Sequence, residues 1–179
     1  MNIRTIAIQS PGDMGHGIGR LLVEGGYRVV SALEGRSERT KTLSQEAGIE
    51  DVGDIDNLFD SVDVILSIMR PDKALEFIET LAEKATLYPS RPVIVDLNAI
   101  SPNTGKNAAQ KASSVGLEFI DGGIIGGPPR APKNAPTGIK SKFVAQLFIF
   151  KIITKVAPRP APAADPNKNG SANGFLKIP

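Results

Sequence analysis

The first 24 residues run from a strand through a glycine turn into a helix, and this order constrains the fold more than any other feature of the chain. Residues 3–9 predict a first strand, which leads directly into the sequence SPGDMG. Residues 14–24 predict a helix with one apolar face, and the glycine pair 25–26 ends it. A strand, a tight glycine turn and a helix in this order are what a dinucleotide diphosphate requires.

The turn supplies the backbone that such a diphosphate needs. Gly12 lets the chain approach the phosphates without a Cβ atom, and Gly15 lets the helix pack closely on the strand. Free N–H groups of the first helical turn then point at the anion. We therefore expect the diphosphate to be bound by Ser10, Pro11, Gly12, Asp13, Met14 and Gly15. Because Ser10 stands where the pattern G-x-G-x-x-G has its first glycine, a turn without function is the alternative.

Strand and helix patterns alternate as far as residue 121. Further strands are predicted at residues 27–33, 62–68, 93–97 and 117–121. Helices are predicted at residues 39–47, 54–59 and 72–86, the last capped by Asp72, and from Pro102 to a stop at Gly116. Strands dense in valine and isoleucine, joined by amphipathic helices, favour a parallel sheet covered on both faces. The expected fold class is α/β, a doubly wound parallel sheet of the Rossmann type.

The composition changes after Gly127. Nine of the 14 prolines lie from Pro128 onward, and residues 157–174 are too rich in Pro, Ala, Asn and Gly to bury a core. Residues 1–129 carry 12 basic and 18 acidic side chains, whereas residues 130–179 carry 9 basic and 1 acidic. We expect a nucleotide-binding domain at 1–140, an apolar segment at 141–156 and a disordered tail at 157–179. The alternative is that the residues after about Arg130 are not the natural continuation of this sequence.

The apolar segment and the tail bear on partners. Residues 143–153 are apolar enough that they must pack on the sheet, meet a partner such as a second copy of the chain, or aggregate. The run is shorter than the ~20 residues of a membrane helix, so no membrane span is expected. The basic tail has few aromatic residues and no nucleic-acid module, so no nucleic-acid partner is expected.

Residue types that are scarce exclude other chemistry. The chain has no cysteine and one histidine, so we expect no metal site, and a reducing, cytoplasmic location is consistent with this composition. His16 follows the turn and is expected to face solvent without a catalytic role. No nucleophile elbow or Walker phosphate loop is present, which argues against a hydrolase or an NTPase.

The end of the second strand bears on the choice between NAD and NADP. Glu34 lies 22 positions after Gly12 and could accept a hydrogen bond from a ribose 2′-hydroxyl, as NAD requires. Arg36 and Ser37 instead offer a guanidinium and a hydroxyl donor suited to a 2′-phosphate. We expect NADP, with NAD less favoured; the alternative is that Arg36 and Arg39 are simply the solvated ends of a loop and a helix.

Residues 3–127 resemble the 6-phosphogluconate dehydrogenase and β-hydroxyacid dehydrogenase family, in particular a divergent branch whose phosphate turn reads SPGDMG. SIMRP at residues 67–71 resembles the family's cofactor-contacting loop, and DLNAISP at 96–102 resembles its D-x-S-T-x-x-P element beside the nicotinamide. FID at 119–121 with the glycine pair 126–127 resembles its substrate segment. The resemblance implies that Met69 and Asn98 contact the cofactor and that Gly126 and Gly127 bind substrate.

The resemblance also implies an activity, the oxidation of a small hydroxyacid or the reduction of its carbonyl form, with a lysine as general acid and base. Ile125 stands where the family has a substrate-binding serine, so the substrate is not carried over. The family places its lysine in an all-α second domain that we do not find after Gly127, and Lys168 lies in unsuitable surroundings. The alternative function is a truncated relative that binds cofactor or a partner without turnover.

Overall fold

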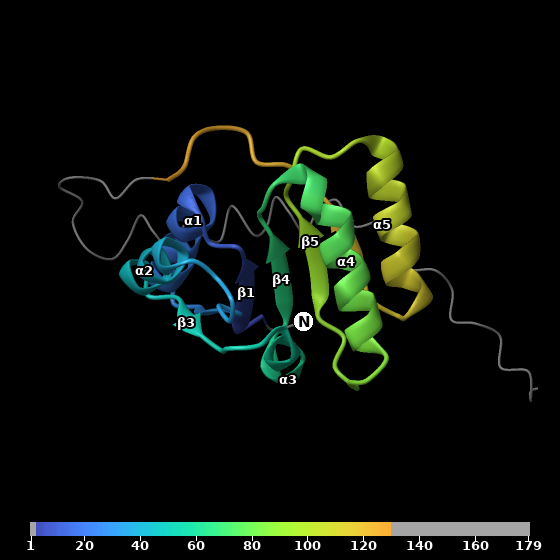
Figure 1. The fold of residues 1–179 in the computed structure, drawn as a ribbon, viewed down its shortest axis with the longest axis horizontal. Helices are drawn as coiled ribbons and strands as arrows, with labels where there is room; N and C mark the ends of the chain where they lie inside the picture. The colour runs from blue at the N-terminus through green and yellow to red at the C-terminus, as the bar shows by residue number, and fades with distance from the viewer. Residues whose placement is uncertain (1–2, 130–179) are drawn as a thin grey trace, which may run out of the picture.

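The computed structural model describes residues 3–129, which form six strands, five α-helices and one short 3-10 helix (Figure 1). The strands are β1 (Thr5–Gln9), β2 (Arg28–Ser31), β3 (Glu50–Asp51), β4 (Val64–Ser67), β5 (Val93–Asp96) and β6 (Phe119–Asp121). The helices are α1 (Asp13–Glu24), α2 (Glu38–Glu46), η1 (Ile55–Asn57), α3 (Leu58–Ser61), α4 (Pro71–Ala85) and α5 (Pro102–Ser114). The strands pair in the order β3-β2-β1-β4-β5-β6, and every pairing is parallel. The predicted doubly wound sheet is therefore confirmed.

Helices cover both faces of this sheet. Side chains alternate along each strand, so the apolar strands present buried residues on both faces. On β1, Ile6 and Ile8 join one buried cluster with Ile18 and Leu22 of α1. Ala7 faces the opposite way, into a second cluster that contains residues of α3, α4 and α5. Figure 1 shows the two groups of helices, with α1 and α2 at one end and α4 beside α5 at the other.

The strand order fixes where a ligand can bind. β1 lies at the centre, and the chain builds outward from it in one direction through β2 and in the other through β4. The helices that follow β1 and β4 therefore leave toward opposite faces of the sheet, which opens a crevice beyond the carboxyl ends of these two strands. The sequence SPGDMG lies at the end of β1, at this crevice.

Two local predictions were wrong or incomplete. Helix α4 begins at Pro71 with Arg70 as its N-cap, and Asp72 lies within the first turn instead of capping it. The Asp72 carboxylate accepts hydrogen bonds of 3.0 and 2.9 Å from the Arg70 guanidinium, while proline suits the first helical position because it has no N–H to satisfy. Strand β3 was not predicted; it pairs with β2, and its Glu50 accepts two hydrogen bonds from the Arg28 guanidinium.

Other expectations concern parts of the chain outside these elements. Within residues 3–129, no helix has both the length and the apolar character needed to cross a membrane. The expectations for the 130–140 end of the first domain, for the apolar segment at 141–156 and for the tail at 157–179 lie outside the described residues.

Candidate functional site

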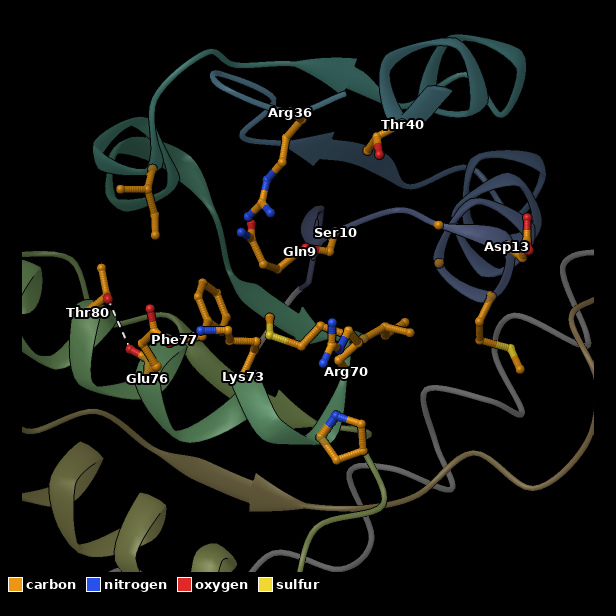
Figure 2. A pocket seen from close by; sticks show the side chains of 17 residues that line it. Gln9, Ser10, Asp13, Arg36, Thr40, Arg70, Lys73, Glu76, Phe77 and Thr80 are labelled. Atoms are coloured by element: carbon orange, nitrogen blue, oxygen red, sulfur yellow. Dashed lines mark hydrogen bonds and ion pairs between the residues drawn. The ribbon is translucent and has the colours of Figure 1, made fainter. Parts of the chain in front are cut away.

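A cleft of about 920 Å³ lies at the carboxyl ends of β1 and β4 (Figure 2). Four segments form its walls: the end of β1 with the turn to α1, the segment after β2 with the start of α2, the beginning of η1, and the loop after β4 with the first turns of α4. The lining residues are Gln9, Ser10, Gly12, Asp13, Met14, Gly15, Arg36, Thr40, Ile55, Ile68, Met69, Arg70, Pro71, Lys73, Glu76, Phe77 and Thr80. The cleft therefore occupies the crevice that the strand order requires.

The turn after β1 is held by one short backbone hydrogen bond. The Gly12 N–H donates to the Ser10 carbonyl oxygen at 2.6 Å, which closes a three-residue turn about Pro11. The fixed φ of proline suits the centre of such a turn. Ser10 has φ +59, and among the described residues it is the one residue other than glycine with a positive φ. This explains why glycine is the usual residue at this point of the fingerprint.

Helix α1 begins with unsatisfied backbone donors that face the cleft. Its N-cap, Gly12, makes no side-chain cap hydrogen bond, and the first N–H to bond back within the helix is that of His16, which donates to the Gly12 carbonyl at 2.9 Å. Within residues 3–129, the N–H groups of Asp13, Met14 and Gly15 have no hydrogen-bond acceptor. Three free amides at the positive end of a helix dipole are suited to an anion.

The two glycines of the turn serve different ends. A Cβ on Gly15 would lie 3.3 Å from Ile8 Cγ2 and 3.4 Å from the Ser10 carbonyl, so this glycine lets α1 pack on β1. A Cβ on Gly12 would meet only the Ser10 carbonyl oxygen, at 3.9 Å, so folding does not require glycine there. The space that a side chain at Gly12 would fill is left open beside the free amides. The residues present therefore fit a diphosphate.

Two side chains near the turn interact with its surroundings. The Asp13 carboxylate accepts a hydrogen bond of 2.6 Å from the Arg39 guanidinium of α2, so the negative charge nearest the free amides is paired. His16, which we expected to face solvent, is half-buried, and its Nδ1 donates to the Gly12 carbonyl oxygen at 2.9 Å. The ring therefore supports the turn through its backbone.

The segment after β2 places one cation in the cleft. Arg36 lines the cleft and has no carboxylate partner among the described residues, and Thr40 lines it from α2. Ser37 caps α2 with its Oγ, which accepts from the Thr40 N–H at 3.3 Å and lies 3.1 Å from Thr40 Oγ1. Glu34, the alternative ribose partner, is exposed and does not line the cleft.

A buried polar network holds the opposite wall, at the ends of β4 and β5. Asn98 is 6% exposed, and its Nδ2 donates to Asp96 Oδ1 at 2.6 Å and to Ser67 Oγ at 2.9 Å. Its Oδ1 accepts from the Met69 N–H at 2.7 Å, which tethers the loop that lines the cleft. Burial raises the pKa of the Asp96 carboxyl, while the hydrogen bonds from Ser67 and Asn98 oppose that rise. The Asn98 side chain therefore acts on the cleft through Met69.

The structure brings together most, but not all, of the residues that the sequence singled out. Ser10, Gly12, Asp13, Met14, Gly15, Arg36 and Met69 line one cleft. Five others lie outside its lining: Pro11 is buried behind the turn, Ser37 caps α2, Asn98 is buried behind Met69, and the glycine pair 126–127 is exposed. Sequence reasoning missed Gln9 and the α4 residues Lys73, Phe77 and Thr80. The three α4 residues have helical spacing, and α4 directly follows β4. This spacing was the sequence signal that could have placed them on the cleft side of the helix.

The strained conformation of Ser10 gives a stability prediction. Ser10→Gly should raise the free energy of unfolding by about 0.5–1 kcal/mol, because the αL conformation costs a residue with a Cβ ~1–2 kcal/mol and glycine loses part of that gain in unfolded-state entropy. Urea denaturation measures the change. Ser10→Ala keeps the Cβ and is the control; an equal gain in that variant would show that φ is not the cause.

The fold and the cleft together define a nicotinamide dinucleotide-binding Rossmann domain. Residues 5–156 match the model of a family described as the NAD binding domain of 6-phosphogluconate dehydrogenase, and the chain belongs to this family. The resemblance inferred from the sequence is thereby confirmed. A nicotinamide dinucleotide is the cofactor of this domain.

Similar proteins extend the comparison. The chain is 30% identical over 98 residues to an uncharacterized 28.5 kDa protein of Methanothermus fervidus, which covers 55% of this chain and 36% of that protein. A conserved protein of unknown function, described as structurally similar to 3-hydroxyacid dehydrogenases, superposes with a TM-score of 0.59 at 25% identity over 68% of this chain and 44% of its own. The 3-hydroxyisobutyrate dehydrogenase of Mycobacterium tuberculosis superposes with a TM-score of 0.58 at 18% identity. The match covers 70% of this chain and 42% of the dehydrogenase. The chain thus spans less than half the length of these relatives.

Proposed function

We propose that the cleft binds NADP(H), and that the chain is the cofactor-binding part of an oxidoreductase acting on a small hydroxyacid or its carbonyl form. One observation carries the choice of NADP over NAD. Of the residues that follow β2, Arg36 and Thr40 line the cleft and Glu34 does not. An unpaired guanidinium at this position complements a 2′-phosphate, whereas NAD recognition requires an acid there.

The diphosphate lies on the turn between β1 and α1 in this proposal. The N–H groups of Asp13, Met14 and Gly15 donate to its oxygens, and the missing side chain of Gly12 lets it approach. Ser10 and Pro11 act by shaping the turn, through the hydrogen bond from Gly12 to the Ser10 carbonyl. Because Arg39 already pairs with Asp13, the carboxylate repels the phosphates less than a free one.

The 2′-phosphate lies between Arg36 and the start of α2. The guanidinium supplies two parallel donors, and the N-terminal end of the helix dipole adds a favourable field. Ser37 and Thr40 hold their hydroxyl oxygens 3.1 Å apart. Whichever of the two donates to the other, one hydroxyl proton stays available for a phosphate oxygen.

The reactive end of the cofactor extends past Met69 in this proposal. Asn98 positions Met69 through the hydrogen bond to its N–H, so it serves the cofactor indirectly. The glycine pair 126–127 follows β6, whose carboxyl end lies at the same edge of the sheet as those of β4 and β5, and we assign it to the substrate. The bound nicotinamide supplies or accepts the hydride; the chain's part is to hold and orient it.

Arg36→Ala tests the choice of cofactor. The substitution should weaken NADPH binding by about 1–3 kcal/mol, the scale of a charge-assisted contact, and leave NADH binding nearly unchanged. Fluorescence titration of the purified chain with each nucleotide measures both constants. Arg4→Ala, at an exposed arginine next to the opposite end of β1, is the matched control. Equal losses for NADPH and NADH in the Arg36 variant would refute the 2′-phosphate site.

The substrate class is tested separately, with a panel of 3-hydroxyacids and their carbonyl forms. Absorbance of the reduced nicotinamide reports turnover. Turnover with NADP and at least one member supports the oxidoreductase. Tight NADPH binding without turnover of any member would support a module that binds cofactor only.

A further inference from the structure

We propose that Gln9 is a further cofactor-binding residue, whose Oε1 accepts a hydrogen bond from a donor on the adenosine half of the dinucleotide. The inference rests on the proposed function in one respect, because it takes the dinucleotide to occupy the cleft. Gln9 is the last residue of β1 and directly precedes the phosphate turn. Nothing in the glycine fingerprint points to it, because the pattern begins at the next residue.

The strand alternation determines where the Gln9 side chain points. Ile6 and Ile8 face α1, so Ala7 and Gln9 face the side covered by α3 and α4. Gln9 accordingly lines the cleft together with Phe77 and Arg36. Figure 2 shows the Gln9 and Arg36 side chains pointing toward one another at the same end of the cleft.

The burial of Gln9 makes its position unusual. The residue is 4% exposed, and its Oε1 is buried without a hydrogen-bond partner. Buried polar atoms are nearly always bonded, because an unpaired acceptor loses the water that solvated it. An unpaired acceptor in the wall of a binding cleft is therefore explained if the ligand brings the donor.

The ligand half follows from the neighbours of Gln9. Arg36 and Thr40 place the 2′-phosphate on this side of the diphosphate turn, and Ile55 with Phe77 supplies an apolar wall suited to a purine ring. Two adenosine donors for Oε1 are present whether or not the 2′-hydroxyl is phosphorylated: the ribose 3′-hydroxyl and the 6-amino group of the base. NAD and NADP share both groups. Gln9 therefore contributes affinity for either cofactor, in contrast to Arg36.

Gln9→Met tests this assignment because methionine has a similar size and lacks the acceptor. Two quantities are measured: the dissociation constants for ADP-ribose and 2′-phospho-ADP-ribose by calorimetry, and the melting temperature of the free chain. We expect both ligands to bind about 5- to 30-fold more weakly, as for the loss of one hydrogen bond that leaves a buried donor unpaired. We also expect the melting temperature of the free chain to stay equal or rise, because a buried unpaired atom is removed. Gln9→Leu repeats the test, and Gln45→Met, at an exposed glutamine of α2, is the matched control.

The analogue with hypoxanthine in place of adenine identifies the donor. If Gln9→Met weakens that analogue as much as the adenine nucleotide, the donor is the ribose hydroxyl; if it no longer matters, the donor is the amino group. Unchanged binding of both ADP-ribose ligands in Gln9→Met would overturn the assignment. A lower melting temperature in both Gln9 variants would also overturn it, because Oε1 would then have a partner in the free chain. Failure of the NADP assignment is recognised in a different variant. In that case Arg36→Ala would not lose more affinity for the 2′-phosphorylated ligand than for ADP-ribose.

Discussion

Replacing Gly12 with serine is expected to remove NADPH binding while leaving the fold intact. Gly12 has φ −79 and ψ −156, a conformation open to any residue, and a Cβ there would meet only the Ser10 carbonyl at 3.9 Å. Serine is also at least as good an N-cap as glycine, so the free energy of unfolding should stay the same or rise by a few tenths of a kcal/mol, on the order of 0.3. The oxygen of its hydroxyl would accept a hydrogen bond from an N–H of the first turn, and that N–H would no longer be free to bind the diphosphate.

The expected loss of affinity is large because two effects combine. The new side chain fills the space beside the free amides, and the capped amide is no longer available to the ligand. Losing two charge-assisted hydrogen bonds at about 1.5–2 kcal/mol each weakens NADPH binding by at least about 100-fold. Nucleotide titration and urea denaturation give the two readouts. Gly123→Ser, at an exposed glycine whose added Cβ meets nothing within 4 Å, is the control. Tight NADPH binding by the Gly12 variant would place the diphosphate elsewhere.

The sheet could be predicted from the sequence because it depends on signals within single segments. β1, β4 and β5 are short apolar runs, and the glycines after α1 and α2 end those helices visibly. β3 could not be predicted in this way. Its two residues are acidic and exposed, and the strand is formed by backbone pairing with β2, beside the ion pair of Glu50 with Arg28. A contact between residues 22 positions apart leaves no local pattern.

The candidate site divides in the same way. The diphosphate turn is contiguous, so its residues could be identified one by one. The network of Ser67, Asp96 and Asn98 joins the ends of two strands, and the family resemblance pointed to Asn98 as a cofactor contact. Its buried position could not be foreseen, because burial depends on contacts such as the hydrogen bond with Met69, 29 positions away in the sequence. Gln9 was missed for a related reason: a polar residue at a strand end gives no sign of being buried.

Asn98→Leu should produce a large loss of stability in the described part of the chain. Leucine keeps the Cγ branching of asparagine in a larger side chain, and it removes the donors to Asp96 and Ser67 and the acceptor for the Met69 N–H. The buried Asp96 carboxylate then loses its side-chain donor from residue 98, and the part-buried Met69 N–H loses its acceptor, which together cost about 3 kcal/mol. Urea denaturation at neutral pH measures the cost. Asn107→Leu, at an exposed asparagine of α5, should change stability by no more than ~0.5 kcal/mol.

The pH dependence of that loss distinguishes a broken network from a simple packing defect. Burial already raises the pKa of Asp96, and the donors from Asn98 oppose the rise, so the variant raises this pKa further. A raised carboxyl pKa gives stability that is present at low pH and lost as the pH rises through the folded-state value. Because the folded-state pKa of Asp96 is higher in the variant, the loss of this stability continues to a higher pH than in the parent chain. The deficit should therefore shrink in acid, where Asp96 is protonated in both, and widen toward neutral pH. A deficit independent of pH would mean that leucine only packs badly and that Asn98 does not stabilise the Asp96 carboxylate.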